Sequence, residues 1–173
     1  MNSKSILNKI KNYDISAKKF YGQNFLFDEN ILRKIVEKSN IKEKIDILEI
    51  GPGPGGLTQE ILKSNVNEVF VIEKDKDLLP LLKDIKKSFP NKLNIIFQDA
   101  LNFDIRKLNY NPFKIISNLP YNISTILLIK WLTTDICNTS CISLTLMFQK
   151  EVAERIVAKK GSSKRSRISI MTE

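Results

Sequence analysis

Residues that can do chemistry follow two short apolar segments of this sequence. Four of its six glycines lie within residues 51–56, and Glu73 closes the next apolar segment. Gly51, Gly53 and Gly56 match the pattern G-x-G-x-x-G, in which the backbone turns tightly and approaches a ligand at the amide-rich start of a helix. A carboxylate after the next strand can accept both hydrogen bonds of a ribose diol. Together they predict a site for an adenosine-containing cofactor, although glycines that only shape a turn would give the same first pattern.

A second carboxylate, Asp99, ends a third apolar segment, where it could accept a hydrogen bond from an adenine amino group. Ligands of parallel α/β sheets bind beyond the carboxyl ends of the strands, so Gly51, Glu73 and Asp99 are expected at one site. Two cofactor classes fit these residues. A nicotinamide dinucleotide needs the helix amides for its pyrophosphate, whereas S-adenosylmethionine has no phosphate and lies over the glycine loop.

The segment Asn118-Leu119-Pro120-Tyr121 follows a fourth apolar segment and favours the second cofactor. The amide oxygen of Asn118 and the backbone carbonyl of Leu119 could take the N–H bonds of an adenine amine. Its lone pair would then point at a sulfonium methyl group. Pro120 fixes the backbone, and the ring of Tyr121 would stack on the flipped-out base. An ordinary proline turn is the alternative interpretation of these four residues.

The composition excludes several mechanisms. The 173 residues include no His and two Cys, so His-dependent nucleophiles, His-ligated zinc and Cys₄ clusters are excluded and no metal site is expected. A net charge of +9 favours a polyanionic partner such as nucleic acid. Cys137 and Cys141 lack metal or redox spacing, and no apolar stretch is long enough for a membrane span. We therefore expect reduced thiols, no membrane association and a cytoplasmic location.

Apolar segments typical of buried strands alternate with segments of helical spacing, which predicts a mostly parallel sheet with helices on both faces. The expected fold is a Rossmann-like α/β domain, and S-adenosylmethionine as the favoured cofactor would make it a class I S-adenosylmethionine-dependent methyltransferase. Asp28 is expected to cap a helix ahead of the first strand, and Asp77 to cap the helix that contains Pro80. The expected strands are 46–50, 68–72, 93–97, 114–117 and 141–148.

The two ends of the chain differ from the middle. Residues 1–19 form a basic extension with five lysines, and residues 20–173 form the expected cofactor-binding catalytic domain. A run with six Lys or Arg, residues 155–167, is expected to be a solvated helix end more than a binding patch. Residues 168–171 begin an apolar element that the chain does not complete, so C-terminal sequence is expected to be missing. With five strands, the fifth is expected at an edge of the sheet.

These motifs together resemble one family, the ribosomal RNA adenine dimethyltransferases, from about Lys18 to the end of the chain. The resemblance is greatest to the bacterial members that dimethylate two adjacent adenosines near the 3′ end of 16S ribosomal RNA. It implies that the cofactor S-adenosylmethionine is bound by Asn24, Leu26, Gly51, Gly53, Glu73, Asp99 and Asn118. It also implies that Asn118, Leu119, Pro120 and Tyr121 form the target-base pocket. The motifs are Lys19-Phe-Tyr-Gly-Gln-Asn-Phe-Leu26, Glu49-Ile-Gly-Pro-Gly53, Val71-Ile-Glu73, Gln98-Asp-Ala100, Asn118-Leu-Pro-Tyr-Asn-Ile-Ser124 and Gln149-Lys-Glu-Val152.

The resemblance implies the small ribosomal subunit as partner and a monomeric enzyme, but the chain departs from the family in two places. Arg165-Ser166-Arg167 stands where the family usually has Tyr-Gly-Arg. The family's last two strands and small helical RNA-binding domain are absent, which implies a weaker grip on RNA. The alternatives are a large-subunit adenine methyltransferase of the macrolide-resistance type, a non-catalytic RNA-binding assembly factor, and a nicotinamide-dependent oxidoreductase.

Overall fold

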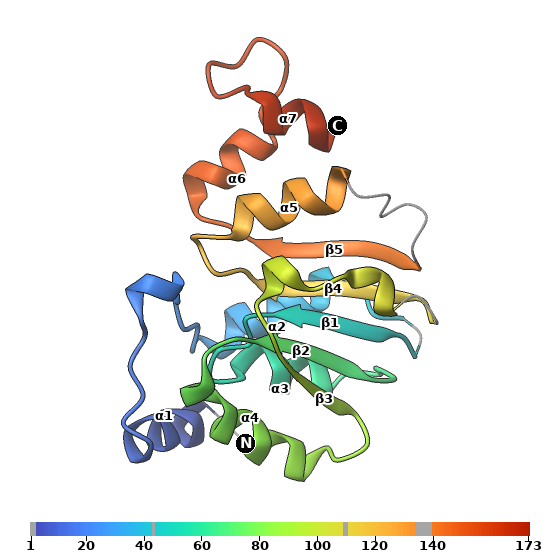
Figure 1. Cartoon of the computed structure of the whole chain (residues 1–173). Coiled ribbons are helices and arrows are strands. Elements are labelled where there is room, and N and C mark those ends of the chain that lie inside the picture. Colours follow the sequence, from blue (N-terminus) through green and yellow to red (C-terminus); the bar gives the residue numbers. More distant parts are fainter. Residues whose placement is uncertain (1–2, 43, 109–110, 134–139) are drawn as a thin grey trace.

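The centre of the molecule is a five-stranded sheet in which every neighbouring pair of strands is parallel. A computed structural model describes residues 3–42, 44–108, 111–133 and 140–173. The strand order is β3-β2-β1-β4-β5, so the order reverses between β1 and β4 (Figure 1). This arrangement confirms the predicted α/β fold. The strands are β1 (Asp46–Ile50), β2 (Val69–Glu73), β3 (Leu93–Phe97), β4 (Phe113–Asn118) and β5 (Cys141–Met147).

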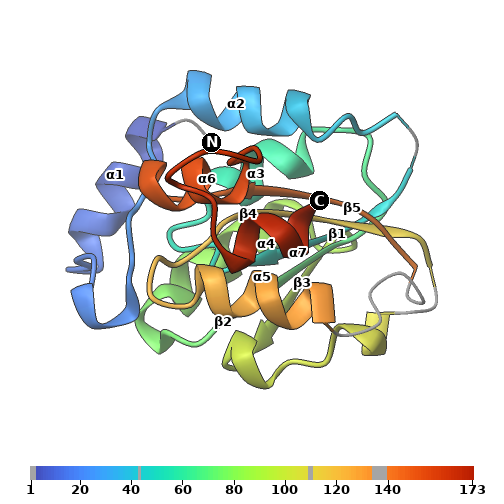
Figure 2. The same cartoon turned by 90° about the horizontal axis from the view of Figure 1, so that it is seen from above.

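Helices cover both faces of the sheet, which explains why β1 is buried along its whole length. Alternate strand residues point to opposite faces, so Ile47 packs in one apolar cluster and Leu48 in the other. The first cluster contains residues of α2 (Glu29–Lys38), α3 (Gly56–Leu62) and α4 (Leu79–Ser88). The second contains residues of α5 (Ser124–Thr133) and of the 3₁₀ turns η3 (Ala100–Asn102) and η4 (Ile105–Leu108). Figure 2 shows α2 and α5 on opposite sides of the sheet.

Strand β5 lies at an edge of the sheet, as predicted, and Ile142 is 60% exposed there. Two short helices follow it, α6 (Lys150–Ile156) and α7 (Arg167–Thr172), which pack against each other, with α7 also against α5. The apolar element expected at 168–171 is therefore part of a helix. Cys137 lies outside the described residues, and burial raises the pKa of the Cys141 thiol to about 11.

One of the two expected helix caps is confirmed and the other is wrong. Asp28 accepts hydrogen bonds from the backbone N–H groups of Asn30 and Ile31, at 2.9 and 3.2 Å. Asp77 does not cap the helix that contains Pro80, because a 3₁₀ turn, η2 (Lys76–Leu78), intervenes and Asp75 caps that turn. Pro80 is still in the first helical turn, where a missing N–H costs nothing.

The basic segment 1–19 contains a helix, α1 (Ser3–Asn12), that the sequence did not indicate. Ile6 of this helix is buried, and the hydroxyl of Tyr13 reaches Asp84 of α4 at 3.5 Å. After α1 the chain runs back past the ends of the strands before it enters α2 (Figure 1). We call residues 18–27 of this connection the strap. Within the described residues, no helix combines the length and apolar character needed to cross a membrane.

Candidate active site

A cavity of about 720 Å³, solvent at its mouth included, lies beyond the carboxyl ends of β1, β2 and β4. This is the point where the strand order reverses, which is where open α/β sheets bind their ligands. The strap, the glycine loop and the ends of the strands supply its walls. The lining residues are Tyr21, Gln23, Asn24, Phe25, Leu26, Leu32, Glu49, Ile50, Gly51, Pro52, Gly53, Pro54, Gly56, Leu57, Ile72, Glu73, Lys74, Gln98, Ala100, Asn118, Pro120 and Ile123.

The glycine loop packs closely against the turn that follows β4. Gly51 has a φ of +63°, and a Cβ added there would lie 2.8 Å from Cγ of Pro120. Gly53 has a φ of +57° and its Cβ would lie 3.3 Å from the ring of Phe25. Glycine suits both positions, because any other residue would be strained in the left-handed backbone, and at Gly51 an added Cβ would also clash with Pro120. The loop that starts α3 thereby brings its backbone to the cavity wall.

Glu73 is fixed at the end of β2 by its own turn. Its Oε1 accepts from the backbone N–H groups of Lys74 and Asp75 at 2.9 and 2.8 Å. Its Oε2 lies 3.4 Å from the N–H of Gly53. Burial raises the pKa of this carboxyl, and the three backbone hydrogen bonds oppose that shift. The carboxylate is thus held against the cavity with one oxygen only weakly engaged, so it can accept hydrogen bonds from a ligand.

A second buried acid, Glu49, also lines the cavity, and sequence reasoning did not select it as a site residue. Its Oε2 accepts a hydrogen bond of 2.6 Å from Oγ1 of Thr58 in α3. Burial raises the pKa of Glu49 to about 8, the charge of Glu73 adds to the rise, and the Thr58 hydrogen bond opposes it. An acid inside the otherwise apolar segment 47–50, next to the glycine loop, is the signal that could have identified it.

The strap is hydrogen-bonded to the turn after β4. Nδ2 of Asn118 donates to the backbone oxygen of Asn24 at 3.1 Å, and Nδ2 of Asn24 donates to the Tyr121 hydroxyl at 2.5 Å. The N–H of Tyr121 also donates to the oxygen of Gly22 at 3.2 Å. Asn24 and Leu26, which only the family resemblance had indicated, are thereby placed on the cavity wall.

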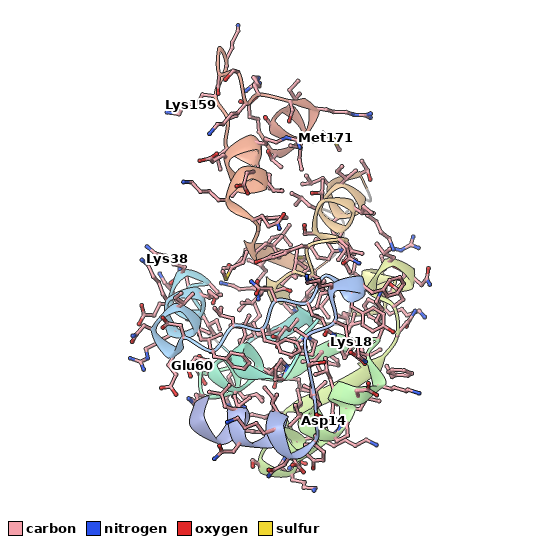
Figure 3. The ribbon with its side chains drawn as sticks, turned by 90° about the vertical axis from the view of Figure 1, so that its left-hand side faces the viewer. Asp14, Lys18, Lys38, Glu60, Lys159 and Met171 are labelled. Atoms are coloured by element: carbon pink, nitrogen blue, oxygen red, sulfur yellow. The ribbon has the colours of Figure 1, made fainter. Side chains whose placement is uncertain are left out.

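The other end of the strap is fastened to the turn after β2. Nζ of Lys18 lies 2.8 Å from Oδ1 of Asp75 and 2.6 Å from Oδ2 of Asp77. Nε2 of Gln23 donates to Oδ2 of Asp75 at 2.9 Å. Figure 3 looks onto this side of the molecule, where Asp14 and Lys18 mark the course of the chain from α1 towards the strand ends. The strap therefore touches both halves of the sheet.

Three predicted site residues do not line the cavity. Asp99 accepts a hydrogen bond from the N–H of Leu101 and pairs with Nζ of Lys74 at 3.2 Å, while its two chain neighbours line the cavity instead. The side chain of Leu119 is 1% exposed and packs in the core, so only its backbone is available to a ligand. Tyr121 lies beside the cavity, where its hydroxyl accepts a hydrogen bond from Asn24 of the cavity wall.

Lys74 and Tyr21 also line the cavity, and sequence reasoning missed both. Nζ of Lys74 lies 5.2 Å from the centroid of the Tyr21 ring, within the range of a cation–π contact. The described residues contain no cluster of three or more side chains placed to hold a metal ion. The site offers amide oxygens, carboxylates, a glycine loop and apolar walls.

The family model for ribosomal RNA adenine dimethylases matches residues 15–173 of the chain. The curated relatives include the ribosomal RNA small subunit methyltransferase A of Roseobacter denitrificans, 45% identical over 95% of this chain and 59% of the relative. The protein of the same name from Paracoccus denitrificans is 44% identical over 95% of this chain and 58% of its own length. The chain therefore spans about three fifths of the length of these relatives.

Two solved structures share the arrangement of strands and helices. A dimethyladenosine transferase from Plasmodium falciparum is 31% identical with a TM-score of 0.71, covering 86% of this chain and 51% of that one. The 23S rRNA methyltransferase ErmE is 27% identical with a TM-score of 0.71, covering 86% of this chain and 57% of that one.

Proposed function

The chain belongs to the ribosomal RNA adenine dimethylase family, and from that premise we propose that it transfers methyl groups from S-adenosylmethionine to N6 of adenosines in 16S ribosomal RNA. The observation that carries this proposal is that Glu73, the glycine loop and Asn118 line one cavity. The curated relatives at 44–45% identity are named for the small subunit, whereas the 23S enzyme is 27% identical. These values favour 16S ribosomal RNA over the large-subunit alternative. We further propose that the protein acts as a monomer in the cytoplasm.

The residues of the cavity fit S-adenosylmethionine. The weakly engaged oxygen of Glu73 suits a ribose diol, and Ile72, Ala100 and Leu26 supply apolar surface for an adenine ring. Gly51 and Gly53 let the loop pack against Pro120 and Phe25, so that its backbone forms part of the cavity wall. Asp99 would bind the adenine amino group after giving up its contact with Lys74. When bound, S-adenosylmethionine supplies a methyl group on a positively charged sulfur.

The turn after β4 provides the acceptors for the target base. Because Nδ2 of Asn118 donates to the strap, its Oδ1 is left to accept an N–H bond from an adenine amine. The carbonyl of Leu119 serves as the second acceptor, and together they favour the pyramidal nitrogen that reacts. Tyr121 stacks on the base, and Pro120 keeps the turn rigid against Gly51. Once methylated, the amine nitrogen is a strongly acidic cation that loses its proton to water, so the site needs no general base.

Methyl transfer to small ribosomal subunits that lack the modification tests the proposal. The unchanged chain should label them, and Asn118→Ala should lower the rate about 100-fold, by analogy with the loss of one group that stabilises a transition state. Asn94→Ala is the control, because Asn94 binds Glu68 and does not line the cavity. Equal rates for the two variants would contradict the role of Asn118, and labelling of large subunits alone would support the alternative family branch.

Calorimetric titration with S-adenosylmethionine tests the cofactor separately. Glu73→Gln should bind roughly 10- to 100-fold more weakly, the range expected when a charged acceptor is lost. Glu68→Gln is the matched control at the other end of β2, outside the cavity. Heat released by NAD and not by S-adenosylmethionine would favour an oxidoreductase. Cofactor and RNA binding without transfer would favour the assembly factor.

A further inference from the structure

Phe20 is 86% exposed, more than any other large apolar residue that the structure describes. Single exposed apolar side chains are common on protein surfaces and need no special explanation. Phe20 differs from the others in where its backbone is held and in what surrounds its ring. It lies in the strap, within the 3₁₀ turn η1 (Lys19–Tyr21).

The backbone of Phe20 is fixed to the turn that we assign to the target base. Its carbonyl oxygen accepts a hydrogen bond of 3.2 Å from Nδ2 of Asn122, the residue next to Tyr121. Gly22 closes η1 with a φ of +64°, and a Cβ added there would lie 2.5 Å from Oδ1 of Asn122. The strap is therefore packed tightly against this turn, and Phe20 has little freedom to move away from it.

The ring of Phe20 lies next to that of Tyr21, a residue of the cavity wall. Its centroid is 5.4 Å from that of Tyr21, with the planes tilted by 58°, and Tyr21 itself lines the cavity. The face of the Phe20 ring is thus presented to solvent, one residue away from the cavity wall.

Ammonium groups lie beside the Tyr21 ring. Nζ of Lys18 and Nζ of Lys74 are 5.6 and 5.2 Å from its centroid, and both are held in place by acids, Lys18 by Asp75 and Asp77 and Lys74 by Asp99. Lys19 is exposed in the same turn as Phe20. Exposed aromatic rings among ammonium groups are the means by which proteins bind single-stranded nucleic acid, since the cations attract phosphates and the rings stack on bases.

We propose that Phe20 stacks on a nucleobase that neighbours the target adenosine in the RNA strand, an inference that rests on the proposed function. The contact is to the face of the base, so it accepts any base. It holds the strand open beside the cavity while Tyr121 holds the target inside. Phe20 binds substrate and takes no part in binding S-adenosylmethionine.

The test is binding of a short RNA hairpin whose loop carries two adjacent adenosines, followed by fluorescence anisotropy. Phe20→Ala should weaken binding roughly 5- to 100-fold, the range measured for loss of one stacked base. Phe20→Trp should bind at least as tightly as the unchanged chain, and Phe20→Leu should not restore affinity. Phe97→Ala is the control, because Phe97 is also an exposed phenylalanine, 59% exposed at the end of β3, but lies outside the strap.

Two further measurements separate stacking from other causes. The dependence of affinity on salt should keep the same slope in Phe20→Ala, whereas Lys19→Ala should reduce it. A 2-aminopurine beside the target adenosine should be quenched by the unchanged chain and by Phe20→Trp, but not by Phe20→Ala.

Unchanged affinity in Phe20→Ala would overturn the proposal, as would full rescue by leucine or failure of the unchanged chain to bind the hairpin. The proposed function is judged separately. Methyl transfer by the unchanged chain together with normal RNA binding by Phe20→Ala defeats the stacking role alone. If Phe20→Ala loses RNA binding and the unchanged chain transfers no methyl groups, the proposed methyltransferase function is contradicted and the stacking role of Phe20 is not. Titration with S-adenosylmethionine should give the same affinity for the unchanged chain and for Phe20→Ala.

Discussion

Gly51→Ala adds a single methyl group where the glycine loop meets the turn after β4. The new Cβ would lie 2.8 Å from Cγ and 3.0 Å from Cδ of Pro120. Carbon atoms pack favourably at about 3.5–4.0 Å. The proline ring cannot rotate out of the way as a flexible side chain would, so the two backbones must separate. The variant also places alanine at a φ of +63°, in the left-handed region.

Both costs can be given a magnitude. The left-handed conformation costs an alanine about 1–2 kcal/mol, and overpacking of this kind costs a further 1–3 kcal/mol or so. We therefore expect a loss of roughly 2–5 kcal/mol in the free energy of unfolding, a large part of the 5–15 kcal/mol or so that is typical of a domain. Gly161 is the matched control, because it has a φ of +88° with no atom within 4 Å of an added Cβ.

Urea unfolding of the two variants without ligand separates the costs. Gly161→Ala should lose only the backbone contribution, and the further loss in Gly51→Ala measures its contact with Pro120. Calorimetry should in addition show that Gly51→Ala binds S-adenosylmethionine at least about 10-fold more weakly, because separation of the loop from Pro120 displaces the cavity wall. Equal losses of unfolding free energy in the two variants would refute this reasoning.

Three further changes test the surroundings of the cavity. The pKa of Glu49 is about 8 in the fold against an ordinary 4.5, so its contribution to stability is full below pH 4.5 and is lost as pH rises towards 8. Glu49→Gln should therefore be a few kcal/mol more stable than the unchanged chain at pH 8.5 and equal to it at pH 4.5, as measured by urea unfolding. Asp75→Asn should speed amide hydrogen exchange in the strap, particularly at Gln23, because local opening of the strap becomes easier. The urea midpoint, which reports global unfolding, should change little. Unaltered exchange would contradict a fastening at Asp75. Tyr121→Phe should keep the KM for RNA within about 3-fold, whereas Tyr121→Ala should raise it roughly 10-fold or more through lost stacking, and equal values for the two would argue against a base at this ring.

The sheet could be predicted from the sequence because its signals are local. Each strand is a short apolar segment, and the chemistry changes where the strand ends: glycines follow β1, Glu73 ends β2, Asp99 comes shortly after β3, and Asn118 ends β4. Parallel order then brings these ends together. The same local character makes the glycine loop predictable, since a positive φ at Gly51 and Gly53 selects for glycine.

The strap could not be predicted, because its position depends on partners far along the chain. Asn24 is held by Asn118 and Tyr121, which are 94 and 97 positions away, and Lys18 by Asp75 and Asp77 at 57 and 59 positions. No periodicity within the strap itself reports such contacts. The prediction that Asp77 caps α4 was wrong for a local reason. The sequence gives no sign that a 3₁₀ turn precedes this helix.

Because the strap is fastened at Asp75 on one half of the sheet and at Asn118 and Tyr121 on the other, the two halves are thermodynamically coupled through a segment that belongs to neither. Each fastening keeps the other at a high effective concentration. Loss of either one weakens the other, so substitutions at Asp75 and Asn118 have non-additive effects on strap closure. By the same reciprocity, a ligand that tightens one fastening strengthens binding at the opposite wall of the cavity.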